Sequence, residues 1–181
     1  MTLFYKEMIT PIGPLTIVGT HSEIVRIDYG TYQELKSKLN AWGAKHLDKP
    51  EFIQQTNEKI AHASGELSGY FAGKSFNFSF PFKYYGTDFE KQVWQALYMT
   101  VPYGATRTYK DIAEIIRNPK SVRAVGRAVN KNPFSIAVPC HRIIGKKGDL
   151  IGYNGGLDKK KYLLTHEREQ MALVTRKTNL T

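Results

Sequence analysis

The chain's 181 residues could fill one large domain or two small ones, and 41% hydrophobic and 23% charged residues are ordinary values for a globular protein. Its single cysteine excludes a disulfide framework and a cysteine-rich zinc site, and no apolar run approaches the roughly 18 residues that span a bilayer. The net charge of +10 favours a polyanionic partner, nucleic acid first.

Two further features bear on where the protein acts. Residues 1–7 lack the charged start and the apolar core of a signal peptide. A lone free thiol suits a reducing compartment. We therefore expect a cytoplasmic protein with no membrane partner.

The first part of the chain reads as an α/β unit. Short β-branched runs predict an antiparallel sheet from residues 4–8, 15–18 and 24–27. Apolar spacing predicts a helix over 33–42 and a longer one that includes Phe52 and ends near Gly73. The alternating phenylalanines of 75–82 predict a strand. No metal site is expected, because ligand-like spacing is missing from His21, His46 and His62.

A loop at 83–87 predicts a domain boundary, which would give domains of residues 1–82 and 83–181. A helix over 88–97 would be capped by Thr87 or Asp88. A second helix would begin at Tyr109 and stop before Asn118-Pro119. Ser121 would cap a third helix over 122–130.

Helix, short turn and helix, with basic residues on the last, is the pattern of a helix-turn-helix motif. The 122–130 helix is rich in small residues and lacks the side-chain tips that read bases in the major groove. It favours a narrower groove and sequence-independent binding, with Arg123 as the one long probe. The alternative is a core helix that packs on its neighbours through alanine and glycine.

The only cysteine, Cys140, lies in the apolar segment 136–144 beside Pro139, His141 and Arg142. A thiolate is a nucleophile, and a neighbouring His or Arg lowers the pKa of a thiol. The alternative is a buried, inert cysteine. Neighbouring side chains of a strand face opposite sides, so either the chain turns at Pro139-Cys140 or His141 reaches the sulfur through a water.

Basic and glycine-rich segments follow the cysteine. Lys146 and Lys147 predict a basic loop, and residues 152–156 are glycine-rich without the Gly-Lys-Ser/Thr ending of a phosphate-binding loop. The glycines would let backbone line a pocket closely. The last helix would carry three consecutive lysines, 159–161, and the tail from Arg168 onward would be irregular.

The motif Pro139-Cys140-His141-Arg142, preceded by Arg123–Gly126 and Asn132-Pro133, resembles the O6-alkylguanine-DNA alkyltransferases. The Tyr109 helix, Gly152-Tyr153 and residues 163–167 fall in the family's order, and the match covers about residues 87–168 strongly. The resemblance implies an α/β (α+β) protein. An RNase H-like domain would precede a mostly helical winged helix-turn-helix domain that holds the acceptor cysteine.

The resemblance also implies the chemistry, a methylated-DNA–protein-cysteine methyltransferase reaction in one turnover. O6-methylguanine is the expected substrate, with O4-methylthymine as a second candidate. Cys140 would accept the alkyl group, His141 would take its proton through a water, and Glu167 would orient His141. Tyr109 would assist departure of the guanine. Asn132 would brace the turn beneath the site.

The implied partner is double-stranded DNA carrying alkylated guanine, approached by a monomer from the minor groove without a cofactor or metal. Arg123 would fill the gap left by the flipped base. Further DNA contacts would come from Tyr109, Lys110, Asn118, Ala124 and Lys146. The base pocket would be lined by Val138, Tyr153 and Gly155. Arg127 departs from the family, because small residues are common at its position.

Two other interpretations remain open. A helix-turn-helix regulator with an inert or redox-sensing cysteine would bind one DNA sequence specifically, which the small residues of the 122–130 helix disfavour. A Cys–His hydrolase would usually draw its histidine from a distant part of the chain, whereas His141 is adjacent to Cys140. Family members that bind lesions without repair carry Trp in place of the cysteine.

Overall fold

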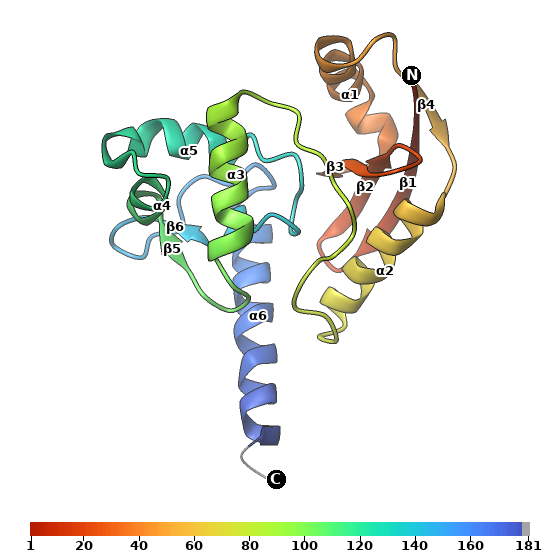
Figure 1. Cartoon of the computed structure of the whole chain (residues 1–181). Helices are drawn as coiled ribbons and strands as arrows, with labels where there is room; N and C mark the ends of the chain where they lie inside the picture. Colours follow the sequence, from red (N-terminus) through yellow and green to blue (C-terminus); the bar gives the residue numbers. More distant parts are fainter. Residues whose placement is uncertain (179–181) are drawn as a thin grey trace. The chain divides into compact units, whose positions relative to one another are not determined.

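The computed structural model describes residues 1–178 and divides into two compact units (Figure 1). The first unit runs from Met1 to Tyr85, and the second begins at Gly86. No helix in the described part of the chain is long and apolar enough to cross a membrane.

A four-stranded sheet in the order β3-β2-β1-β4 organises the first unit. The antiparallel strands β1 (Thr2–Thr10), β2 (Gly13–Gly19) and β3 (Ile24–Tyr29) confirm the three predicted strands. Strand β4 (Glu51–Gln54) pairs parallel to β1 and was missed, since Phe52 was assigned to a helix. Its polar residues are mostly exposed at the sheet edge, so it shows no apolar alternation.

The prediction of a strand over residues 75–82 is wrong. The segment is irregular and makes one isolated bridge, between Ile24 and Phe82. Phe78 and Phe80 are buried, and their rings meet edge to face at 5.9 Å. The alternation therefore reflects aromatic packing rather than strand pairing.

A helix covers each face of this sheet. Helix α1 (Tyr32–His46) begins with a capping box between Thr31 and Glu34, and its Leu35 and Leu39 pack against β-strand residues of the core. Helix α2 (Glu58–Phe71) lies on the other face, where Lys6 of β1 donates to Ser64 of α2. The unit is thus the α/β arrangement expected from the sequence.

The second unit is mostly helical. Its elements are α3 (Asp88–Thr100), β5 (Arg107–Thr108), α4 (Tyr109–Ile115), the 3-10 turn η1 (Pro119–Ser121), α5 (Val122–Asn130), the 3-10 turn η2 (Cys140–Arg142), β6 (Ile143–Ile144) and α6 (Leu157–Thr178). Thr87 caps α3 as expected. The Trp94 indole N–H donates to the Ala128 carbonyl at 2.8 Å and ties α3 to α5. Strands β5 and β6 pair in parallel.

The predicted helix, turn and helix correspond to α4, η1 and α5, with one correction. Ser121 stands at the start of α5, but it makes no side-chain cap. Its hydroxyl donates instead to the carbonyl of Asn118, the residue before η1, at 2.7 Å. Because η1 leads directly into α5, the Ser121 hydroxyl lies next to a carbonyl of the preceding turn and bonds to it instead of capping α5.

The tail was expected to be irregular from Arg168 onward, and this is wrong for the described part. Helix α6 continues to Thr178, while residues 179–181 lie outside the described residues. Residues 168–173 are Arg, Glu, Gln, Met, Ala and Leu, all good helix formers, with no glycine or proline to end the helix.

Candidate active site

The chain turns sharply at Cys140, which answers the question that the sequence left open. Cys140–Arg142 form the 3-10 turn η2, closed by a hydrogen bond from the Arg142 N–H to the Pro139 carbonyl at 3.0 Å. The Cys140 N–H also bonds back to the Val138 carbonyl at 2.8 Å. Cys140 and His141 are therefore not held on opposite faces of a strand. Cys140 is 5% exposed.

Asn132 braces this turn from beneath. Its buried amide nitrogen donates to the carbonyls of Val138 at 2.8 Å and Phe134 at 3.1 Å, and lies 3.0 Å from the Cys140 sulfur. Its amide oxygen accepts from the Phe134 N–H at 2.9 Å. One side chain thus fixes the backbone before the cysteine and contacts the sulfur itself.

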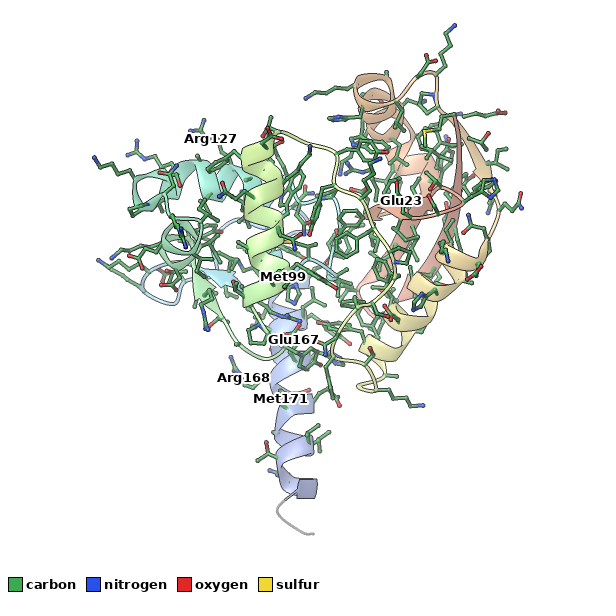
Figure 2. All side chains as sticks on the ribbon, viewed as in Figure 1. Glu23, Met99, Arg127, Glu167, Arg168 and Met171 are labelled. Carbon is green, nitrogen blue, oxygen red and sulfur yellow. The ribbon has the colours of Figure 1, made fainter. Side chains whose placement is uncertain are left out.

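Glu167 projects from the middle of α6 (Figure 2). It is the centre of a buried polar cluster. Its carboxylate accepts from His141 Nε2 at 2.7 Å and from Arg142 Nε at 2.9 Å. It also accepts from the Gly104 N–H at 3.0 Å. Gly104 has φ +76°, and a Cβ there would come within 2.7 Å of Met171, so this close approach to α6 requires glycine.

The charge state of the cluster follows from its geometry. Burial raises the pKa of Glu167, but the hydrogen bonds from His141 and Arg142 and the charge of Arg142 outweigh burial and hold that pKa well below its usual range. The permanent charge of Arg142 is sufficient to keep Glu167 ionised. Burial lowers the pKa of His141, opposed by Glu167, so the resting imidazole is neutral.

The neutral imidazole has a defined acceptor atom. An ionised carboxylate can only accept hydrogen bonds, so His141 Nε2 carries the hydrogen that it shares with Glu167. Nδ1 then holds a lone pair. It is buried and has no hydrogen-bond partner among the described residues. His141 is therefore arranged to receive a proton at Nδ1 and to share the resulting charge with Glu167.

The resting thiol differs from the sequence expectation. Burial raises the pKa of Cys140, and the Asn132 amide, the Lys160 charge and a hydrogen bond with Tyr153 only partly oppose it. Arg142, expected to help ionise the thiol, points elsewhere: its guanidinium bonds Glu167 and the Val101 carbonyl. Cys140 is thus protonated at rest, and its proton must be removed for reaction.

Tyr109 is the first residue of α4, which Thr108 caps in a capping box with Asp111. The Tyr109 hydroxyl donates to the Ile151 carbonyl at 3.1 Å. Burial raises the pKa of Tyr109, so the phenol stays a proton donor. An ideal Cβ on Gly126 of α5 would lie 3.8 Å from the Tyr109 ring, which places α5 close to this phenol.

The remaining predicted residues occupy the surface and the loops around the site. Val138 is fully buried just before the turn, and Tyr153 and Gly155 are half-buried after β6. Ala124 is half-buried on α5, the helix from which the neighbouring Arg127 also extends (Figure 2). The exposed candidates for DNA contact are Arg123, Lys110, Asn118 and Lys146. Among the described residues, no three His, Cys, Asp or Glu side chains gather to hold a metal ion.

Both units match known family models. Residues 3–84 match the ribonuclease-like domain of 6-O-methylguanine DNA methyltransferase, and residues 88–169 match its DNA-binding domain. A methylated-DNA–protein-cysteine methyltransferase of Methanosarcina barkeri is 39% identical over 93% of this chain and 99% of its own. A protein of the same name from Mycobacterium leprae is 41% identical over 92% and 93%.

The chain belongs to the 6-O-methylguanine DNA methyltransferase family. The crystal structure of the Mycobacterium tuberculosis OGT in complex with DNA superposes with a TM-score of 0.76. It is 34% identical, and the match covers 94% of each chain. The α/β unit followed by a mostly helical unit is thus the fold that the family resemblance implied.

One residue of this methyltransferase-family site was missed in the sequence. Lys160 was named only as one of three consecutive lysines of the last helix and was given no place in the site, yet it is fully buried there. Its ammonium group donates to the carbonyls of Ile143 and Ile151. Helical spacing could have found it, because Lys160, Leu163 and Glu167 lie at i, i+3 and i+7 on one face of α6.

Proposed function

We propose that this protein repairs alkylated DNA by moving the alkyl group of O6-methylguanine onto Cys140, once per molecule. O4-methylthymine is a second candidate substrate. The observation that carries the proposal is the buried relay at the cysteine. A neutral His141 holds an unpartnered Nδ1 in the cysteine's own turn, while its Nε2 is bonded to an ionised Glu167.

The reaction begins with removal of the thiol proton. His141 Nδ1 takes it through a bridging water, and the Glu167 carboxylate stabilises the imidazolium that forms. The thiolate then attacks the methyl carbon, so that the S–C bond forms as the C–O6 bond breaks. Tyr109 donates its phenolic proton to the departing guanine, so negative charge does not accumulate on the base. The product thioether is not readily reversed, which limits each molecule to one turnover.

A base inside the duplex cannot reach a cysteine that is 5% exposed, so the damaged nucleotide must leave the stack. Helix α5 presents small residues and the exposed Arg123, which can enter the gap from the minor groove. The surrounding exposed cations, among them Lys110 and Lys146, contact phosphates without reading sequence. We propose a monomer that acts on double-stranded DNA in a reducing compartment such as the cytoplasm.

The division of labour between the units follows from the same residues. Cys140, His141, Glu167, Tyr109, Asn132 and Arg123 all lie beyond Gly86, in the second unit. We propose that this unit, close to the predicted domain of residues 83–181, carries both DNA binding and transfer.

The proposal is tested by counting products. Duplex DNA that carries one O6-methylguanine is mixed with increasing amounts of protein, and restored guanine is quantified. The amount restored should equal the amount of protein when substrate is in excess. Cys140→Ala should bind the same duplex and restore nothing. Repeated turnover, or repair by the Cys140→Ala variant, would contradict the proposal. Binding to a single undamaged sequence alone would instead favour a regulator.

A further inference from the structure

Lys160 is a buried cation at the point where three segments of the site meet. It lies on α6 with no exposed surface. Its ammonium group donates to the Ile143 carbonyl, directly after the cysteine turn, and to the Ile151 carbonyl at 3.0 Å. A lysine with two carbonyl acceptors is a cation held in place, whereas surface lysines are free to move.

The Ile151 carbonyl has a second donor, the Tyr109 hydroxyl at 3.1 Å. Ile151 belongs to the pocket loop, here residues 145–153, whose first half is closed by a hydrogen bond from the Gly145 N–H to the Asp149 carbonyl at 2.8 Å. If Tyr109 gives its proton to a departing base, its hydrogen bond to Ile151 is lost. Lys160 still holds that carbonyl, so the loop stays in place while Tyr109 acts.

The same ammonium group influences the sulfur. The groups that interact with the Cys140 sulfur come from four elements: Tyr109 of α4, Asn132 after α5, Tyr153 of the pocket loop and Lys160 of α6. Asn132 and Tyr153 offer neutral donors, and Lys160 offers the positive charge of its ammonium group, whose pKa is lowered by burial but raised by the nearby Cys140 sulfur. Lys160 also disfavours a charged His141, which Glu167 and not Lys160 must therefore stabilise.

We infer that Lys160 is a positioning residue of the transfer reaction. Its ammonium group fixes the pocket loop at Ile151 and stabilises the negative charge that the Cys140 sulfur carries when it attacks. The inference rests on the proposed alkyl transfer for its biological use. Its electrostatic part concerns the thiol alone and can be measured without DNA.

The test measures the rate at which iodoacetamide alkylates Cys140 as a function of pH. In this reaction the S–C bond forms, the C–I bond breaks, iodide leaves and the thiol proton passes to the buffer, so the rate reports the thiolate at each pH. Lys160→Met removes both charge and donors. Lys160→Gln removes the charge and keeps donors for the two carbonyls. Lys160→Arg keeps the charge. The control is Lys161→Met, the exposed neighbour on the same helix.

Both neutral variants should shift the pH midpoint of the reaction upward and react about tenfold more slowly at pH 7, which corresponds to one pKa unit. Lys160→Arg and Lys161→Met should keep the wild-type midpoint. Because the Gln variant preserves hydrogen bonding, it carries the test if the Met variant does not fold. A folded Lys160→Gln protein with an unmoved midpoint would overturn the inference and leave Lys160 a structural tether.

The outcomes also separate this inference from the proposed function. A wild-type protein that takes no methyl group from DNA, combined with a shifted midpoint in the Lys160 variants, would refute the function and support the inference. Normal methyl transfer by the wild-type protein with an unmoved midpoint in Lys160→Gln would refute the inference alone. A single-turnover assay with methylated duplex should show the neutral variants slowed by a similar factor of about ten.

Discussion

Replacing Glu167 with Gln should destabilise the protein severely. Among the described contacts, the Glu167 carboxylate is the only negative charge that His141 and Arg142 contact. The acid accepts from His141 Nε2, from two nitrogens of Arg142 and from the Gly104 N–H. Gln is the same size but neutral, and its NH₂ group would face donors. The buried Arg142 would then lack a counterion.

Removing one partner of a buried ion pair costs about 3–5 kcal/mol. For a chain of this length, 1 kcal/mol corresponds to about 2–4 °C in melting temperature, so Glu167→Gln should melt roughly 6–20 °C lower. Transfer should also slow by on the order of 100-fold, the lower range for loss of general base support, since the His141 imidazolium loses its partner. The rate is measured in a single turnover at a temperature where both proteins are folded.

The matched control is Glu169→Gln, an exposed carboxylate two residues along α6. It should melt and react like the wild type, because exposed charges contribute little to stability. Unfolding of Glu167→Gln at the wild-type temperature would refute a stabilising role for the cluster. Alkyl transfer by the folded variant at the wild-type rate would refute its role in catalysis.

Three further predictions concern DNA and pH. Arg123→Ala should slow repair of duplex DNA strongly but leave the reaction with free O6-benzylguanine unchanged, while Arg123→Lys should restore binding more than rate; full rescue of rate by Lys would reduce Arg123 to a phosphate contact. Replacing Lys146 and Lys147 with Ala should lower the slope of log affinity against log salt on every sequence, and an unchanged slope would place them outside the interface. The pKa of His141 is lowered by burial, so stability should fall as pH drops below about 6.5, the pKa of an unfolded histidine. The pKa of Glu167 is also lowered, so stability should fall again below about 4.3, where the unfolded carboxyl takes up a proton and the folded one does not. A second loss of the same size in Glu167→Gln would contradict this assignment.

The elements that the sequence predicts well are those with a strong local signal. The β-branched runs of β1 to β3 and the Thr87 cap of α3 need no distant contacts to be recognised. Strand β4 is a polar edge strand whose pairing with β1 is decided by the fold, so its four residues carry no such signal. The phenylalanines of 75–82 satisfy a strand pattern while packing on each other in an irregular segment.

The site shows the same division between local and distant information. The Pro139-Cys140-His141-Arg142 motif identifies the reactive turn from neighbours in sequence. The direction in which Arg142 points depends on Glu167 and Val101, which are far along the chain. Likewise, the burial of Lys160 and the raised pKa of Cys140 arise from packing among α4, α6 and the pocket loop. Adjacency in the sequence therefore pointed to Arg142 as the cation near the thiol, whereas the charge that acts on Cys140 is that of Lys160.

The most direct test of Cys140 as the alkyl acceptor is the mass of the protein after reaction. The intact chain is incubated with excess duplex DNA that carries O6-methylguanine and is then weighed, digested and sequenced by mass spectrometry. Each molecule should gain the mass of one methyl group in place of a hydrogen, on the peptide that contains Cys140 and on no other. A protein that restores guanine without gaining that mass, or that gains it elsewhere, would contradict the assignment of Cys140 as the acceptor.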